Sequence, residues 1–315
     1  MISLLRQFVA MLTSLLMLFG IYHAPAKDDP VVALEPAAVQ TQIALFADTQ
    51  IIANTKRQFA CKAAFEDVDN NAAVIDGIVV AGDISESGDD ITNEIIINMI
   101  KETTVGRKII ASGNHDVRLN YKHTMARFIN DVNNLGCADY TVEKPYYYTT
   151  VNGYYFIVLG TEKQVLEKAY ISDTQLQFLD EMLAEATKDG KPAFVVVHQP
   201  LANTNGLPGI WKTGDLGNQS EAVGDIMNKY DNVFYLCGHT HAGFYEYTYD
   251  TYKGKTPCIN IPTVGKVSSR GYKDNGLGFM MEIYEDKVVF RSRDFADGYY
   301  LGGEHPDFDR TYPLV

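Results

Sequence analysis

The sequence predicts an α/β fold in which a largely parallel or mixed sheet is covered by helices. Short apolar runs alternate with segments of helical periodicity over the first two thirds of the chain, which is typical of this class. The last third changes to patterns typical of antiparallel hairpins. The 315 residues are 46% hydrophobic and 21% charged, a composition that excludes a disordered or collagen-like chain.

Strands and helices are expected in alternation along the chain. Apolar runs predict buried strands at residues 42–47, 75–81, 108–111, 154–159, 193–197 and 232–237. Helical periodicity predicts helices at residues 91–103, 121–135, 173–187 and 218–230. The third of these helices has clear end signals, because Ser172 can cap its start and Gly190 follows its end.

The last third is expected to add antiparallel strands to a sheet and not to form a second domain. Residues 244–249 alternate with a period of two, and a Lys-Gly-Lys turn at 253–255 leads to residues 259–261. A further pair, 280–283 and 288–290, flanks the turn residues Glu285 and Asp286. The tyrosines in 244–249 could form a binding surface, but packed sheet faces explain such ladders more often.

The N-terminus has the features of a targeting segment. Arg6 precedes an apolar run at 8–21, and Ala24-Pro25-Ala26 offers a small-residue cleavage site. We therefore predict a signal peptide at 1–26, a leader at 27–40 and a single domain at 41–315. The protein is expected to be secreted, periplasmic or attached to the cell envelope. The alternative is a membrane anchor formed by an uncleaved 8–21 segment.

The acidic balance limits the possible partners. With 27 Lys and Arg against 40 Asp and Glu, the formal net charge is -13, which argues against a nucleic-acid polymer as partner. A phosphorylated substrate would have to be attracted locally, against the long-range field of the protein. Metal ions or a few focused cations would provide that attraction.

Five of the predicted strands lead directly into polar residues. Asp48-Thr49-Gln50, Gly82-Asp83, Gly113-Asn114-His115-Asp116, His198-Gln199-Pro200 and Gly238-His239-Thr240-His241 each follow one strand. In open α/β sheets, ligands bind in the crevice outside the carboxyl ends of the strands. Three carboxylates, one amide and four imidazoles are therefore expected near one edge, a mixture that suits a pair of divalent transition metals.

Each of these motifs also has an ordinary structural explanation. Asp48-Thr49-Gln50 alone is more often a turn or a helix cap, and His198 alone could be a hydrogen-bonded core histidine. His239 and His241 are stronger candidates, because alternate residues after a strand point the same way. Five such motifs in this order make the purely structural explanation improbable.

In these motifs the sequence resembles the calcineurin-like metallophosphoesterases over about residues 42–294. The resemblance implies a four-layer α/β/β/α sandwich of two mixed sheets flanked by helices, with two metal ions, Mn, Fe or Zn, between the sheets. It implies one metal held by Asp48, Gln50, Asp83 and His241. The other would be held by Asp83, Asn114, His198 and His239, so that Asp83 bridges the two.

The resemblance also implies roles in catalysis. His115 would donate a proton or a hydrogen bond to the leaving oxygen, and Asp116 would orient that imidazole and raise its pKa. A metal-bridging hydroxide would attack phosphorus in line. The sequence departs from the common pattern at Gln50, where the family usually has His. A neutral amide oxygen is a harder ligand than imidazole, so the Asp48 site is expected to bind transition metals more weakly and to accept Mn²⁺ or Mg²⁺.

The expected function is hydrolysis of phosphate esters by an exported metal-dependent enzyme. A phosphatase acting on small phosphorylated compounds or phosphoproteins is slightly favoured over a phosphodiesterase. The alternative is a metal-binding surface protein with little turnover; Gln50 supports it, and the retained His115-Asp116 pair argues against it.

A loop at 202–211, which holds the only tryptophan, Trp211, is either a substrate-selecting loop or an unrelated surface loop. Arg270 either contacts substrate or forms a surface salt bridge.

Overall fold

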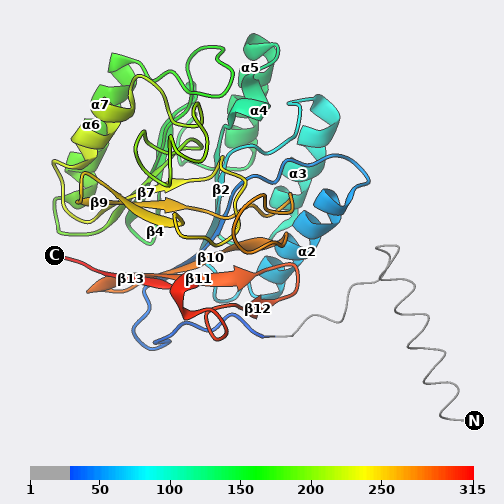
Figure 1. Cartoon of the computed structure of the whole chain (residues 1–315), viewed down its shortest axis with the longest axis vertical. Helices are drawn as coiled ribbons and strands as arrows, with labels where there is room; N and C mark the ends of the chain where they lie inside the picture. The colour runs from blue at the N-terminus through cyan, green and yellow to red at the C-terminus, as the bar shows by residue number, and fades with distance from the viewer. Residues whose placement is uncertain (1–28) are drawn as a thin grey trace, which may run out of the picture.

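Two mixed β-sheets pack face to face in the computed structural model, which describes residues 29–315 (Figure 1). The first sheet has the order β12-β11-β10-β1-β2-β3, with β13 paired to β11. Within it, β1, β2 and β3 are parallel and the remaining pairs are antiparallel. Its strands are β1 (Thr41–Phe46), β2 (Gly77–Ala81), β3 (Arg107–Ala111), β10 (Leu277–Ile283), β11 (Lys287–Asp294), β12 (Tyr299–Tyr300) and β13 (Arg310–Pro313).

The second sheet has the order β4-β5-β6-β7-β9-β8. Its central strands β5, β6, β7 and β9 are parallel, and antiparallel strands β4 and β8 form the edges. The strands are β4 (Tyr147–Val151), β5 (Tyr154–Val158), β6 (Ala193–Val196), β7 (Val233–Cys237), β8 (Tyr249–Tyr252) and β9 (Thr256–Asn260).

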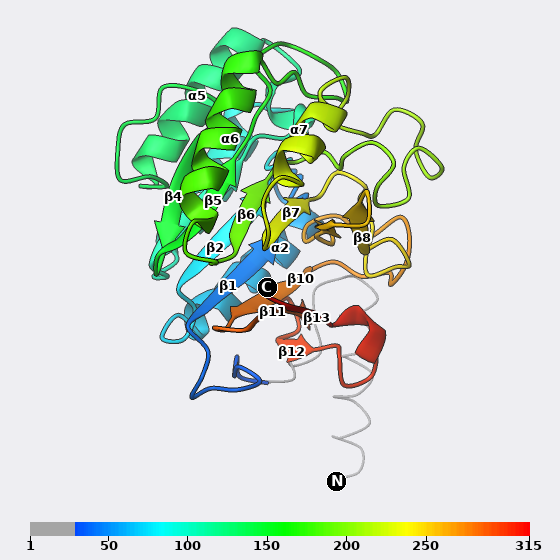
Figure 2. The ribbon, with the colours of Figure 1, turned by 90° about the vertical axis from the view of Figure 1, so that its left-hand side faces the viewer.

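Helices cover the outer faces of both sheets, which completes the four layers (Figure 2). Helices α6 and α7 pack on the second sheet, and Phe65 of α2 contacts Phe46 of the first sheet with a ring distance of 5.4 Å. The helices are α2 (Lys56–Asn70), α3 (Asp90–Glu102), α4 (Asn114–Val117), α5 (Tyr121–Asn134), α6 (Asp173–Thr187) and α7 (Ser220–Met227), with a 3₁₀ turn at Pro306–Phe308. The predicted α/β/β/α sandwich is therefore confirmed.

Side chains along each strand of the second sheet point alternately to its two faces, so the sheet contributes to two hydrophobic cores. Phe156, Phe194 and Phe234 stack along its inner face, with ring distances of 5.0 and 5.5 Å between neighbours. Phe234 also reaches Phe290 of β11 in the opposite sheet, at 6.0 Å. The intervening residues, such as Val195, pack against α6 and α7. Strands buried on both faces appear in sequence as continuous apolar runs, which is why they could be predicted.

The predicted elements agree with the structure except for the strand expected at 244–249, which is wrong. Helices α2 and α4, strands β4, β12 and β13 and the 3₁₀ turn were not predicted. Residues 244–248 form a turn, in which Tyr245 N–H donates to Thr248 Oγ1 (2.8 Å) and Thr248 N–H donates to Tyr245 O (3.0 Å). These local hydrogen bonds replace a strand ladder, and β8 begins at Tyr249.

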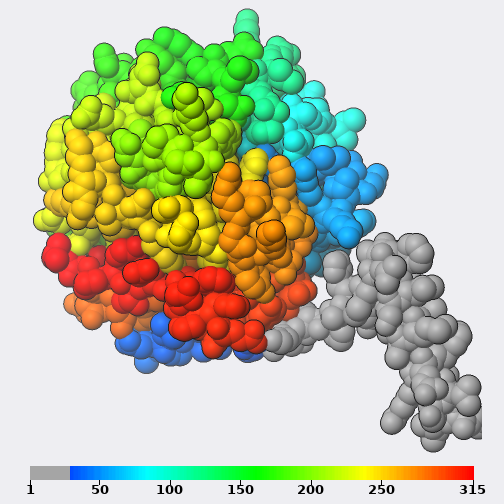
Figure 3. All heavy atoms as spheres, in the orientation of Figure 1, coloured from blue at the N-terminus to red at the C-terminus, as the bar shows by residue number. Residues whose placement is uncertain are grey.

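The described part of the leader packs against the first sheet. Val31 and Ala33 are buried, and Leu34 N–H donates to Glu282 Oε2 (3.1 Å). Arg291 Nη1 donates both to Val32 O (2.6 Å) and to Glu282 Oε1 (2.9 Å). In Figure 3 this segment (blue) lies at the same end of the molecule as the C-terminal strands (red). The predicted signal peptide lies outside the described residues.

No helix within residues 29–315 has the length and apolarity needed to cross a membrane. The four cysteines, Cys61, Cys137, Cys237 and Cys258, are all buried free thiols.

Asp294, at the end of β11, predicts a pH-dependent stability. Burial raises its pKa to about 7, and its Oδ2 has no hydrogen-bond partner among the described residues. Because its pKa is raised in the folded state, the Asp294 carboxyl contributes fully to the stability of the fold only below its unfolded pKa, near 3.8. This contribution is lost as the pH rises through about 7.

Asparagine does not titrate, so Asp294→Asn should not lose stability in this way. We therefore expect the free energy of unfolding of Asp294→Asn, relative to that of wild type, to be higher at pH 8 than at pH 4 by roughly 2–4 kcal/mol. Urea unfolding at both pH values measures the difference, with Asp286→Asn in the exposed β10–β11 turn as the control. An equal effect of Asp294→Asn at both pH values would contradict the prediction.

Candidate metal centre

The five strand-end motifs meet where the carboxyl edges of the two sheets face each other. Strands β1, β2 and β3 of the first sheet and β6 and β7 of the second deliver them. Backbone hydrogen bonds join the motifs, from Asp48 N–H to Gly82 O (3.1 Å) and from Gly238 N–H to His198 O (2.9 Å). The structure thus brings together all the residues for which ligand roles were predicted, namely Asp48, Gln50, Asp83, Asn114, His198, His239 and His241.

The backbone at these motifs is strained and closely packed. Five of the candidate ligands have positive φ angles: Asp48 (54°), Gln50 (37°), Asp83 (51°), His239 (72°) and His241 (48°). Non-glycine residues rarely adopt this region, and such strain clusters at functional sites. A Cβ at Gly113 would lie 2.1 Å from Asp83 Oδ1, and one at Gly238 would lie 2.8 Å from Asp48 Oδ2. Only glycine therefore allows these motifs to approach each other.

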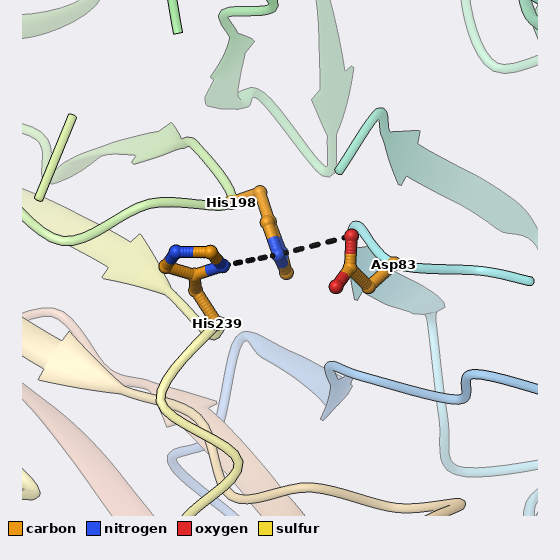
Figure 4. Close-up of side chains that lie close together, drawn as sticks. All are labelled: Asp83, His198 and His239. Carbon is orange, nitrogen blue, oxygen red and sulfur yellow. Dashed lines mark hydrogen bonds and ion pairs between the residues drawn. The ribbon is translucent and has the colours of Figure 1, made fainter. Parts of the chain in front are cut away.

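One half of the centre consists of Asp83, His198 and His239, whose ligand atoms lie close enough together to hold one ion. Figure 4 shows His198 between the other two side chains. Its Nε2 is 3.2 Å from Asp83 Oδ1 and 3.1 Å from His239 Nδ1. His198 Nδ1 lies 2.8 Å from the carbonyl oxygen of Ala81, a contact that fixes Nδ1 as the donor and leaves Nε2 for a metal. The buried Oδ1 of Asn114 has no hydrogen-bond partner among the described residues.

The other half consists of Asp48, Asp83 and His241. His241 Nε2 lies 3.5 Å from Asp48 Oδ1 and 3.9 Å from Asp83 Oδ2. Gln50 Nε2 donates to Asp83 Oδ2 (3.1 Å). Within the described chain, Asp48 Oδ1, Gln50 Oε1 and His241 Nε2 are buried without hydrogen-bond partners. Such orphaned donor and acceptor atoms are costly unless a ligand satisfies them, so these residues fit two metal ions that share Asp83.

Charges in the centre shift the pKa values of its groups in opposite directions. Burial raises the pKa of Asp48. Burial would also raise that of Asp83, but the adjacent His198 and His241 hold it well below its usual range. Burial would lower the pKa of His198, yet the two carboxylates raise it to about 9. His239 is buried beside the positive charge of His198, so its pKa lies well below its usual range. The site is built to receive positive charge.

His115 and Asp116 do not form the pair that the sequence predicted. Asp116 accepts hydrogen bonds from the backbone N–H groups of Ile84 (3.2 Å), Ser85 (3.0 Å) and Gly113 (2.8 Å). His115 Nδ1 instead lies 2.5 Å from the carbonyl oxygen of Glu86. The expectation that Asp116 orients the imidazole is therefore wrong: Asp116 joins two loops, and Glu86 O orients His115.

His115 faces the centre without belonging to either ligand cluster. Its Nε2 lies 3.9 Å from Asp83 Oδ2, and its side chain is 13% exposed. Its backbone N–H donates to Asp83 Oδ1 (2.9 Å). A mostly buried imidazole beside the shared carboxylate, with one nitrogen already held by a backbone carbonyl, is well placed to exchange a proton at the other nitrogen.

Three residues around the centre were not predicted to act on its ligands. Glu167 Oε2 accepts from Asn114 Nδ2 (3.1 Å), which fixes the Asn114 amide and leaves its buried Oδ1 without a partner among the described residues. The Trp211 ring stacks on His239 at 4.4 Å, so loop 202–211 does lie beside the centre. Lys266 Nζ lies 3.5 Å from His241 Nδ1. These contacts join loops far apart in the sequence, and only the single tryptophan signalled one of them. Arg270 Nη2 donates to Ile210 O (3.0 Å), which ties this loop in place.

The Gln50→His substitution should show how far the two halves of the centre differ in metal affinity. Imidazole binds transition metals better than a neutral amide oxygen does, so we expect the variant to tighten the weaker of two metal sites by about tenfold. Calorimetric titration of metal-stripped protein with Mn²⁺ and Zn²⁺ measures both dissociation constants. Two equally tight sites in wild type, unchanged by Gln50→His, would contradict this expectation.

Comparison with known proteins agrees with the geometry. The sequence profile of the calcineurin-like phosphoesterases matches residues 41–243. No curated protein sequence matches the chain. A dimetal phosphatase from Danio rerio has a similar structure, with a TM-score of 0.64 at 15% identity over 88% of this chain and 100% of that one. A purple acid phosphatase from yellow lupin seeds gives 0.56 at 14% identity, over 82% of this chain and 52% of that one.

A third similar structure is GAP50 of Plasmodium, described as the anchor in the inner membrane complex. Its TM-score is 0.54 at 14% identity, over 88% of this chain and 89% of that one. At such identities these likenesses establish the fold alone. The family profile covers more than half of the chain and includes the five strand-end motifs. The chain therefore belongs to the calcineurin-like phosphoesterase family of phosphoric ester hydrolases, which use two divalent metal ions.

Proposed function

We propose that the protein is an exported metal-dependent phosphatase that hydrolyses phosphate monoesters of small compounds or phosphoproteins. The observation that carries this proposal is the pair of ligand clusters sharing Asp83, with His115 beside them and outside both. A purely metal-binding site has no need of that third group. Two proteins of similar fold, from zebrafish and lupin, are described as phosphatases, which supports a phosphatase over a phosphodiesterase.

In this proposal, each half of the centre is held by residues of both sheets. Asp48, Gln50, Asp83 and His241 would hold one metal, and Asp83, Asn114, His198 and His239 would hold the other. When bound, the two ions would supply positive charge to neutralise the phosphoryl group and activate the attacking water. Ala81 O and Glu167 orient His198 and Asn114, so these two side chains are held in place before a metal binds.

His115 supplies the proton that the leaving oxygen needs. Its Nδ1 is held by Glu86 O, so Nε2 is the nitrogen that faces the centre and carries the transferred proton. Arg57 bonds both to the Glu86 carboxylate and to Gln50 O, which fixes the Glu86 segment against the metal site. Asp116 fixes the same loop from the other side through Ile84 and Ser85.

Export is supported by the charged, apolar and small-residue regions of residues 1–26. If the segment is a cleaved signal peptide, the protein recovered outside the cytoplasm should begin at Lys27. N-terminal sequencing of that protein measures this, and recovery of the intact chain in the membrane fraction would favour an uncleaved anchor instead.

A metal-binding surface or anchoring protein with little turnover is the second candidate. Two observations favour it: Gln50 replaces the usual histidine ligand, and the fold is similar to that of the Plasmodium anchor protein. The two candidates differ at His115, which a surface protein does not require.

The substrate class is tested with an aryl phosphate monoester and its diester analogue, at saturating Mn²⁺, with the chain starting at Lys27. We expect the monoester to be hydrolysed with the higher kcat/KM. Preference for the diester would replace the phosphatase assignment by a phosphodiesterase. Absence of turnover with both metal sites filled would favour the surface protein.

A further inference from the structure

Lys266 lies on the outer side of a predicted metal ligand. Its Nζ is 3.5 Å from His241 Nδ1, whereas His241 Nε2 faces Asp48 and Asp83. The backbone around Lys266 is fixed to the centre, because Thr263 Oγ1 lies 3.2 Å from Lys266 O and 3.1 Å from Asp48 O. The ammonium thus lies one imidazole ring away from the Asp48 carboxylate.

This arrangement opposes metal binding at His241. A metal-bound histidine normally donates its outer N–H to a carbonyl or carboxylate, as His198 does to Ala81 O. An ammonium group has three donors and no acceptor, so it cannot receive that N–H. For His241 to bind a metal through Nε2, Lys266 has to move away from Nδ1 or leave two donors facing each other.

The positive charge of Lys266 also opposes metal binding at the Asp48 half. Among the described residues, the contact recorded for Lys266 Nζ is the one with His241 Nδ1, and no salt bridge joins it to a carboxylate. That charge repels a divalent cation at the Asp48 half. The other half contains no such opposition: Ala81 O and the Glu167 carboxylate orient His198 and Asn114.

We propose that Lys266 keeps the Asp48 half a weak and exchangeable metal site, while the Asp83–His198–His239 half holds its metal tightly. The occupancy of the weak half would then follow the ambient metal concentration, and with it the activity of the enzyme. This inference rests on the two-metal centre of the proposed function, but it concerns metal affinity and does not depend on turnover.

The structure provides an internal reporter for the tight half. Trp211 is the only tryptophan of the chain, and its ring stacks on His239 at 4.4 Å. Its fluorescence should therefore change when a metal binds at His239. Calorimetry records both sites, so the two signals together assign each dissociation constant to one half of the centre.

The test uses metal-stripped full-length mature protein titrated with Mn²⁺ and Zn²⁺. We expect Lys266→Met to tighten the weak site by about tenfold and to leave the Trp211-reported site unchanged, because one opposing unit charge is removed. Lys266→Gln, which retains polarity without charge, should tighten it similarly if the methionine variant does not fold. Lys266→Arg keeps the charge and the donor-only character, so its weak site should match wild type.

Lys273→Met is the matched control, since it removes one exposed lysine from the same segment without touching His241. We expect its two dissociation constants to equal those of wild type. The proposal is overturned if neutral substitutions of Lys266 leave the weak site within twofold of wild type, or loosen it. Metal affinities are measured without substrate, so an inactive protein would refute the proposed function and leave this test intact.

Discussion

Asp83→Asn is expected to lower kcat by roughly 10³-fold or more. Asp83 belongs to both ligand clusters, and it also accepts the backbone N–H of His115. Asparagine keeps one acceptor oxygen but removes the negative charge that both metals would share in the proposed centre. Metal binding should therefore weaken at both halves, and calorimetry should show this together with the loss of phosphatase activity.

Asp89→Asn is the matched control for this substitution. Asp89 lies six residues further on, and its side chain caps α3 by accepting from Thr92 N–H (2.9 Å). Asparagine is an equally good N-cap, so this variant should retain metals and turnover. If Asp83→Asn bound two metals as tightly as wild type, Asp83 would not be the shared ligand.

His115→Ala is expected to lower kcat by roughly 10²–10⁴-fold while the protein keeps both metals, because the imidazole transfers a proton and binds no metal. Its distance of 3.9 Å from Asp83 Oδ2 and its bond to Glu86 O place it beside the centre. The loss should be smaller for substrates with acidic leaving groups, such as nitrophenyl esters, than for alkyl phosphates, since a good leaving group needs less protonation.

His123→Ala controls for the removal of a histidine. His123 is exposed on α5 and pairs with Asp90 on the surface, so its loss should leave kcat within about twofold. A His115→Ala protein that loses metal would show that His115 is a ligand. Full activity without His115 would exclude the proton-donor role, and a wild-type protein with no turnover to lose would favour the metal-binding surface protein.

The meeting of the candidate ligands could be predicted because the position of each is determined by local sequence. A continuous apolar strand followed at once by Asp, Asn or His places that side chain at the carboxyl edge of a sheet, whatever the rest of the chain does. Gly113 and Gly238 are part of the same local motifs, and they let the motifs approach each other closely. Helix α6 was predicted at its observed bounds because its cap signals at Ser172 and Gly190 are also local.

The groups that orient the ligands could not be predicted in this way. Glu167 is 53 residues from Asn114, and Lys266 is 25 residues from His241. Their contacts depend on how the loops between strands fold over the edge of the sheets. The wrong pairing of Asp116 with His115 has the same origin: adjacent residues at the start of the short helix α4 point in different directions, toward the loop backbone and toward Glu86.

Hydrolysis of an aryl phosphate monoester by metal-stripped protein, before and after Mn²⁺ is added back, tests the central claim most directly. We expect no turnover in the stripped protein and full turnover only when both halves of the centre are filled. Undiminished turnover by protein from which both metals have been removed would contradict a two-metal phosphoesterase centre built around Asp83.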